Sequence, residues 1–202
     1  MASTNVFGKP VTGGTRLERA RKANEDPNAD GKRDEAVKYV KKQKENFGSG
    51  VSTLSIFYNA TGETLFYAED DSKYGKIYDS YPARVQNGQW GAFLHIKNPV
   101  VASGSEAFVV YRGRFNDTDY CKQLIAWDVP WDQLTGYNHA YCEINDDNSE
   151  IDKNKVYKNM EAGGRQHSIM KSGIFLTSYI DEGSSPMYEA QFILADAARA
   201  AR

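Results

Sequence analysis

Residues 51–67 read Val51-Ser52-Thr53-Leu54-Ser55-Ile56-Phe57-Tyr58-Asn59-Ala60-Thr61-Gly62-Glu63-Thr64-Leu65-Phe66-Tyr67. Residues 51–58 are rich in β-branched and aromatic side chains that partly alternate with polar ones, as in a β-strand. Residues 59–62 supply the small and polar side chains of a turn, and residues 63–67 resume the strand pattern. This stretch predicts two successive strands joined by a short turn.

Strand-like segments of the same kind continue to the end of the chain. They lie at 81–85, 90–97, 107–114, 122–128, 140–145, 173–180 and 187–194, with turn signals such as Asn87-Gly88 and Ser103-Gly104 between them. Short strands at this spacing, without long helices between them, are typical of an antiparallel sandwich or barrel rather than a doubly wound parallel sheet. We expect a mainly β protein, with an antiparallel β-sandwich over residues 51–202.

The N-terminal part has a different, helical pattern. Thr15 and Glu18 have the spacing of a capping box, and the helix that they begin should end near Asp26-Pro27. A second helix is expected over about 34–47, with Gly48 after its last turn. Residues 1–50 also contain more basic than acidic side chains. We therefore predict a helical extension over residues 1–50 that packs outside the sandwich.

Composition excludes several classes of protein. The 202 residues include 13 Tyr, 9 Phe and 3 Trp, too many aromatic rings for a disordered chain. No apolar run is long enough to span a bilayer, and the net charge of −2 indicates no nucleic-acid partner. The N-terminus lacks the pattern of a secretory signal. We expect a cytoplasmic or nuclear protein in which Cys121 and Cys142 are free thiols. The oligomeric state stays open.

Familiar catalytic motifs are absent from the sequence. It contains no phosphate-binding loop, no dinucleotide fingerprint, no zinc-protease helix and no nucleophile elbow. An enzyme acting on a small metabolite would have to assemble its site from dispersed groups, and the candidates are His95, Tyr111, His139 and Glu143. We expect no metal and no cofactor. Residues 143–152 are rich in carboxylates, and either calcium binding or a solvated acidic loop would explain them.

Aromatic residues in loop-like segments are the most suggestive functional feature. Two groups stand out, Tyr74, Tyr78 and Tyr81 near Gly75 and Pro82, and Trp127, Trp131 and Tyr137 around Pro130 and Gly136. Exposed amphipathic rings suit sugar stacking or a membrane interface. The alternative is that these rings are buried in the core of the sandwich.

Several motifs resemble the plant 23 kDa jasmonate-induced proteins. They are Ala2-Ser3-Thr4-Asn5-Val6-Phe7-Gly8-Lys9-Pro10-Val11-Thr12, Asn28-Ala29-Asp30-Gly31-Lys32-Arg33, Tyr58-Asn59-Ala60-Thr61-Gly62-Glu63-Thr64-Leu65, Asn87-Gly88-Gln89-Trp90-Gly91-Ala92-Phe93-Leu94-His95 and Val109-Val110-Tyr111-Arg112-Gly113. The resemblance covers about residues 1–145 and implies a cytosolic or nuclear stress-responsive plant protein. It supplies no catalytic residues.

A second resemblance, to aegerolysin and actinoporin-type sandwiches, rests on three shorter motifs. These are Asn59-Ala60-Thr61-Gly62-Glu63-Thr64-Leu65, Gly88-Gln89-Trp90-Gly91 and Ala126-Trp127-Asp128-Val129-Pro130-Trp131. Taken together, the two resemblances favour a non-enzymatic defence or stress protein. Its aromatic loops would bind a glycan, a lipid or membrane, or another small-molecule ligand. The alternative remains an enzyme that acts on a small plant metabolite.

Overall fold

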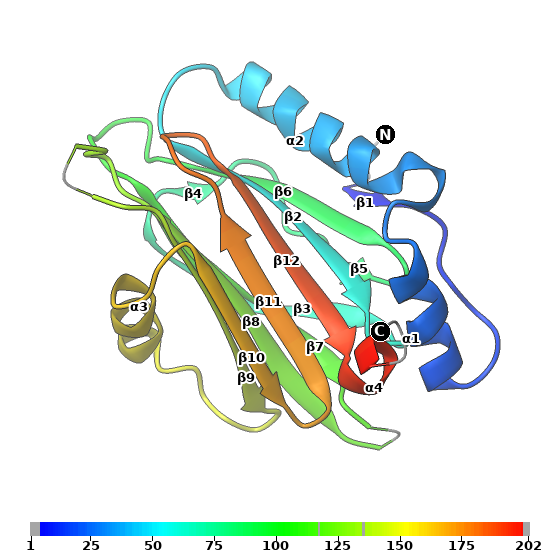
Figure 1. The fold of residues 1–202 in the computed structure, drawn as a ribbon. Coiled ribbons are helices and arrows are strands. Elements are labelled where there is room, and N and C mark those ends of the chain that lie inside the picture. Colours follow the sequence, from blue (N-terminus) through cyan, green and yellow to red (C-terminus); the bar gives the residue numbers. More distant parts are fainter. Residues whose placement is uncertain (1–4, 117, 135, 200–202) are drawn as a thin grey trace.

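Two β-sheets pack face to face, and helices cover the outer faces of both sheets (Figure 1). The computed structural model describes residues 5–116, 118–134 and 136–199. Residues 1–4, at the start of the predicted helical extension, and residues 200–202, at the end of the predicted sandwich, lie outside the described residues. The same holds for Ala2, Ser3 and Thr4 of the N-terminal motif. No helix within the described ranges combines the length and hydropathy needed to cross a bilayer.

The first sheet has seven strands. Its path is β1-β6-β2-β12-β11-β10, and β4 pairs with β6 beside this path. All of its pairings are antiparallel except β12 with β2, which run parallel with Met187 opposite Leu54. The bounds are β1 Val6–Phe7, β2 Ser52–Ala60, β4 Lys76–Ile77, β6 Trp90–Ile96, β10 Gln166–Lys171, β11 Ile174–Ile180 and β12 Met187–Leu194.

The second sheet has five strands in the order β5-β3-β7-β8-β9, all antiparallel. The bounds are β3 Leu65–Tyr74, β5 Arg84–Val85, β7 Ser105–Arg114, β8 Tyr120–Val129 and β9 His139–Asp146. The inward side chains of the two sheets form the main core, in which Phe57, Phe93 and Trp127 pack together with Tyr188. Burial of these rings stabilises the sandwich because large apolar areas leave water.

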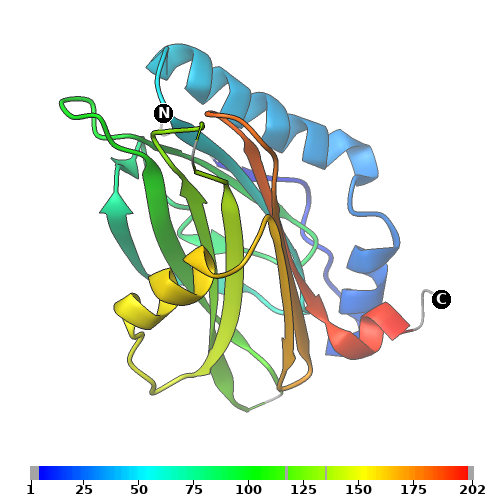
Figure 2. The ribbon, with the colours of Figure 1, turned by 60° about the vertical axis from the view of Figure 1, so that its left-hand side comes forward.

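Helices form an additional layer on each side of the sandwich, as Figure 2 shows. On the first sheet, α1 and α2 cover Leu54, Ile56 and Tyr58 of β2, so this strand is buried on both faces. On the second sheet, α3 packs through Val156 and Met160. The bounds are α1 Arg16–Glu25, the 3₁₀ turn Ala29–Gly31, α2 Lys32–Phe47, α3 Lys153–Glu161 and α4 Ala195–Arg199.

The predicted sandwich with an outer helical pair is confirmed. The capping box is present, since the backbone N–H of Glu18 donates to the Thr15 hydroxyl and the Glu18 carboxylate accepts from the Thr15 backbone N–H. The sequence did not indicate α3, β10 or the parallel pairing of β12 with β2. Residues 6–7 also pair with β6, so part of the N-terminal segment belongs to the sheet. The division of the chain at residue 50 stays a prediction.

Candidate functional site

Three loops lie together at one end of the sandwich, and we call this end the loop end. They span residues 97–104, 130–138 and 181–186, between β6 and β7, β8 and β9, and β11 and β12 (Figure 1). Their positions follow from the strand register: Ser105 is opposite Val129 in the second sheet, and Ser52 is opposite Ile96 in the first. Antiparallel pairing therefore places these connections on one side of the molecule.

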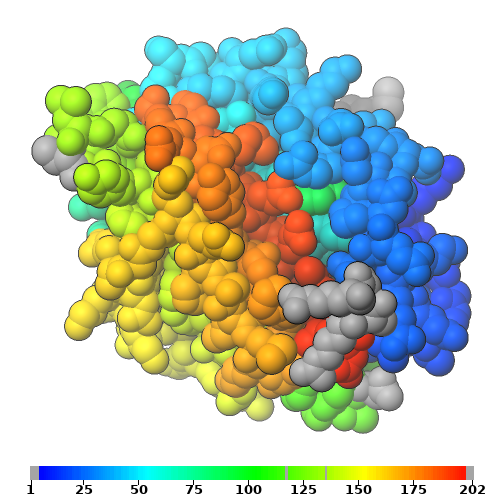
Figure 3. All heavy atoms as spheres, in the orientation of Figure 1, coloured from blue at the N-terminus to red at the C-terminus, as the bar shows by residue number. Residues whose placement is uncertain are grey.

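Large apolar side chains are exposed in two of these loops, residues 97–104 and 130–138, which we call the apolar loops. Leu134 is 96% exposed, Tyr137 80% and Trp131 50%, and Val100 and Val101 are also exposed. Figure 3 shows the 130–138 loop projecting at the upper left, next to the orange 181–186 loop. Clustered exposed apolar groups commonly mark an interaction surface.

Hydrogen bonds hold the apolar loops in shape without burying these side chains. The Lys97 ammonium donates to the backbone carbonyls of Asn98 and Val101 and lies 5.3 Å from the centre of the Trp131 ring, so it links the two loops. In the second loop, the backbone N–H of Leu134 donates to the Asp132 carboxylate at 2.9 Å. A preformed loop loses less conformational entropy when it binds.

The structure divides the predicted aromatic residues into two groups. Tyr74, Tyr78, Trp131 and Tyr137 are exposed at or beside the loop end. Trp127 is completely buried and packs against Phe93 and Tyr188, and Tyr81 packs edge-on against Phe93. Trp127 and Tyr81 thus belong to the core, because β8 points Trp127 inward and Tyr81 lies over the core beside β5. Val100, Val101 and Leu134 were not identified from the sequence.

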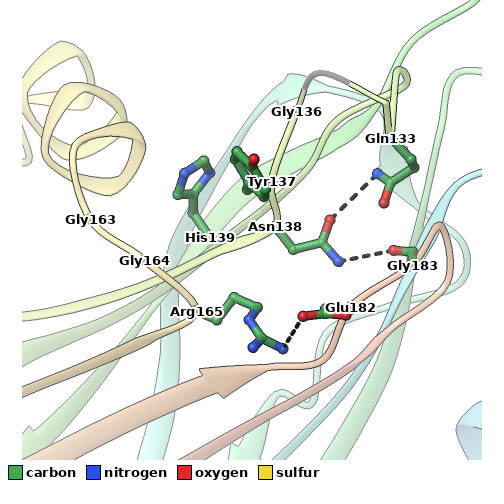
Figure 4. A pocket seen from close by; sticks show the side chains of 10 residues that line it. All are labelled: Gln133, Gly136, Tyr137, Asn138, His139, Gly163, Gly164, Arg165, Glu182 and Gly183. Carbon is green, nitrogen blue, oxygen red and sulfur yellow. Dashed lines mark hydrogen bonds and ion pairs between the residues drawn. The ribbon is translucent and has the colours of Figure 1, made fainter.

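A pocket of about 590 Å³ opens beside the apolar loops. Figure 4 shows Arg165 reaching Glu182 along one side, and Tyr137 and His139 on the other. The Arg165 guanidinium lies 3.1 Å from a Glu182 carboxylate oxygen, and His139 Nδ1 lies 3.1 Å from Asp128 Oδ2. Asn138 forms the floor and is 4% exposed. The pocket therefore has a cationic and an anionic group at its rim.

A second pocket, of about 430 Å³, is lined in part by Trp131. In its wall, Lys73 lies 3.1 Å from the buried Glu106 and also pairs with Glu161. Burial and the nearby Asp128 raise the pKa of Glu106 to about 7, although Lys73 acts in the opposite direction. This pocket has acidic walls and is ringed by paired charges.

A buried polar chain joins the two sheets just below the loop end. His95 of β6 lies 3.0 Å from the Ser72 hydroxyl through Nε2 and 2.9 Å from the Ser105 hydroxyl through Nδ1. The Ser105 hydroxyl in turn lies 2.8 Å from that of Thr53. Burial lowers the pKa of His95 to about 3, so the ring is neutral. Hydrogen bonds satisfy this buried imidazole, which points to a structural role.

The four residues named for a dispersed catalytic site are not assembled. His95 and Tyr111 are completely buried, and the Tyr111 hydroxyl donates to the Pro82 carbonyl at 3.0 Å. Glu143 faces outward on β9 and accepts a hydrogen bond from the Tyr141 hydroxyl. Of the four residues, His139 alone lines the 590 Å³ pocket.

Paired charges and buried thiols account for the remaining candidate groups. In the acidic loop, Asp147 forms a two-pronged ion pair with Arg112 and Asp146 pairs with Lys171. Within the part of the chain that the structure describes, no cluster of three or more His, Cys, Asp or Glu residues is placed to hold a metal. Cys121 and Cys142 are free, as predicted, and both are buried.

Comparison with known proteins agrees with the motifs and the fold. A 23 kDa jasmonate-induced protein of Hordeum vulgare is 43% identical over 122 residues, which cover 59% of this chain. The match spans 57% of that relative, little more than half of its length. The resemblance to the jasmonate-induced proteins is thereby confirmed.

The crystal structure described as that of the lipid-binding protein Nakanori has a similar fold, with a TM-score of 0.82 and 19% identity over 93% of this chain and 99% of that one. The family described as Nakanori-like protein matches residues 4–195, from the strand that precedes the helical pair to the end of β12. This match runs through both sheets and all three longer helices, and on it the chain belongs to the Nakanori-like protein family.

Proposed function

We propose that the protein binds lipid membranes and docks on them through the apolar loops. The observation that carries this proposal is the exposure of Trp131, Leu134 and Tyr137, with Val100 and Val101, together at the loop end. Aromatic and aliphatic side chains of this kind enter the region between lipid headgroups and acyl chains. The description of Nakanori as a lipid-binding protein supports the same function.

The arrangement favours a membrane over a soluble ligand. Leu134 and Val100 project from the tips of separate loops, and their apolar atoms face solvent rather than a closed cavity. A flat lipid surface can cover both tips at once, and it removes their apolar area from water. Because the 97–104 and 130–138 loops are held by internal hydrogen bonds, docking needs no refolding of either loop.

We further propose a stress-responsive role and a cytoplasmic or nuclear location. The barley relative is described as jasmonate-induced, and both cysteines of this chain are free, as expected in a reducing compartment. Docking on a membrane from the cytoplasmic side is compatible with this location.

Co-sedimentation with lipid vesicles tests the proposal. Leu134→Ser and Trp131→Ala should each weaken binding about tenfold or more, because each removes a side chain whose burial is worth roughly 1.5–3 kcal/mol. Phe66→Ser is the matched control, since Phe66 is 47% exposed, close to the 50% of Trp131. Phe66 lies near the start of β3, whereas Tyr74, at the other end of this strand, lies at the loop end. Equal loss in all three variants, or no binding by the unmodified protein, would contradict the proposal.

A further inference from the structure

The pocket lined by Arg165 and His139 shares a wall with the apolar loops. Tyr137 lines the pocket and is also one of the exposed rings of the 130–138 loop. A lipid whose acyl chains contact Leu134 and Tyr137 would therefore present its headgroup at the level of the pocket. We propose that this pocket binds the phosphate group of a membrane phospholipid headgroup, with Arg165 as its main ligand; the inference rests on the proposed function.

Arg165 is suited to this role because its present partner is easily replaced. Its side chain is 42% exposed, and that of Glu182 is 80% exposed on the 181–186 loop. An ion pair this open to water contributes little to stability, so Glu182 can turn away at small cost. A phosphate can take the place of Glu182, because its oxygens, like those of a carboxylate, can accept two parallel charge-assisted hydrogen bonds from the guanidinium.

Hydrogen bonds hold the backbone around Arg165 in place, so the point from which the Arg165 side chain extends is fixed. The Arg165 carbonyl accepts from the Ile180 N–H at 2.9 Å, and the Gly164 carbonyl accepts from the Ala140 N–H at 2.9 Å. On the facing wall, His139 is oriented by Asp128. A site whose walls are already ordered loses little conformational freedom on binding.

The size of the pocket also fits a headgroup. Its volume of about 590 Å³ is in the range of small-molecule sites and exceeds that of a phosphate alone. A Cβ atom built on Gly164 would meet no heavy atom of a residue outside its two chain neighbours within 4 Å, so the pocket wall at Gly164 is open. The rest of a headgroup can occupy this space while the phosphate contacts Arg165.

Vesicles that differ in phosphate but not in net charge provide the test. Phosphatidylcholine carries a phosphate and no net charge, whereas digalactosyldiacylglycerol carries neither a phosphate nor a charge. Arg165→Gln should weaken binding to phosphatidylcholine vesicles about tenfold or more, the effect of losing a charged hydrogen bond, and leave binding to digalactosyldiacylglycerol vesicles unchanged. Glu182→Gln should strengthen binding to phosphatidylcholine, because a competing carboxylate is lost.

A second ion pair supplies matched controls. Lys171 and Asp146 have the same exposures as Arg165 and Glu182, 42% and 80%, but Lys171 ends β10, whereas Arg165 precedes it. Lys171→Gln and Asp146→Asn therefore make the same changes of charge away from the loop end. Neither variant should alter binding to either kind of vesicle.

The outcomes separate the headgroup site from membrane binding itself. If Arg165→Gln binds phosphatidylcholine like the unmodified protein while Leu134→Ser does not bind, the phosphate site is refuted and the proposed function stands. If the unmodified protein binds neither vesicle, the proposed function fails. Calorimetric titration with glycerol 3-phosphate then identifies the source of the phosphate: binding that Arg165→Gln abolishes, without any binding to vesicles, would show a soluble ligand and refute the headgroup.

Discussion

Asn138 donates a hydrogen bond from its side-chain amide to the backbone carbonyl of Gly183 at 2.9 Å, across 45 positions of sequence. The same nitrogen donates to the Asp181 carbonyl at 2.8 Å. One buried amide thus joins two loops. The 130–138 loop connects strands of the second sheet, and the 181–186 loop connects strands of the first sheet. It holds together the two loops that form opposite walls of the Arg165 pocket (Figure 4).

Asn138→Ala should therefore destabilise the protein and loosen the loop end. The variant would lose the two hydrogen bonds that the buried Asn138 amide donates, at a cost of about 1–3 kcal/mol in the free energy of unfolding. Urea denaturation measures this change. Asn148→Ala, at an exposed position in the acidic loop, is the control and should stay within about 0.5 kcal/mol of the unmodified protein. Equal stability of the two variants would show that the Asn138 contacts contribute nothing.

The buried His95 gives the protein a defined sensitivity to acid. Its pKa falls from an ordinary 6.5 to about 3 in the folded protein, so between these values the unfolded chain binds the proton more readily. The contribution of His95 to the free energy of unfolding is therefore fully present above pH 6.5 and is lost as the pH falls toward 3.

His95→Gln removes this dependence while keeping a polar side chain. We expect the variant to be less stable than the unmodified protein at neutral pH, and the difference to shrink on acidification. Denaturation curves at a series of pH values measure it. Glu106 titrates with the opposite sign, because its raised pKa costs stability as the pH rises from 4.5 toward 7, but it is present in both proteins and cancels in the comparison. If the two proteins differed by the same free energy of unfolding at every pH, the lowered pKa of His95 would be contradicted.

The two thiols should be unreactive in the folded protein. Cys121 and Cys142 are buried, and burial raises their pKa values to about 11 and about 12. Alkylation needs the thiolate, so iodoacetamide at neutral pH should modify neither cysteine in the native state and both after denaturation. Mass spectrometry counts the modified sites. A disulfide in protein from its native tissue would contradict the free thiols and the reducing compartment. Rapid labelling of the native protein would contradict the low reactivity of the thiols.

Local sequence patterns were sufficient for the elements whose signals lie within a few residues. The capping box at Thr15 and Glu18 predicted the start of α1, and Gly48 marked the end of α2. The apolar runs within 107–114 and 122–128 predicted β7 and β8, and these strands are buried on both faces, between the main core and α3. A helix cap and a short apolar run between turn residues can be recognised without knowledge of the partner segment.

Other parts depend on contacts that sequence patterns do not record. Strand β10 is an edge strand with mostly exposed side chains, so it lacks an apolar period, and α3 has only a narrow apolar stripe around Val156 and Met160. The parallel pairing of β12 with β2 joins segments far apart in the chain.

Contacts that sequence patterns do not record also explain why only some of the predicted aromatic site residues are exposed. Trp127 and Trp131 look alike in sequence, but β8 turns the first into the core and the loop carries the second outward. The pairing of Arg165 with Glu182, and their approach to His139, arises only when three separate connections meet at one end of the sandwich. Leu134 and Val100 could have been noticed as apolar residues within turn-rich segments.

The fluorescence of Trp131 tests membrane docking most directly. Trp90 and Trp127 are completely buried and Trp131 is half exposed, so the difference between the unmodified protein and Trp131→Phe isolates one ring at the loop end. Docking through the apolar loops predicts that vesicles shift this emission to the blue and that lipids brominated in their acyl chains quench it. Vesicle binding without either change would place the contact elsewhere on the protein and contradict docking through the loop end.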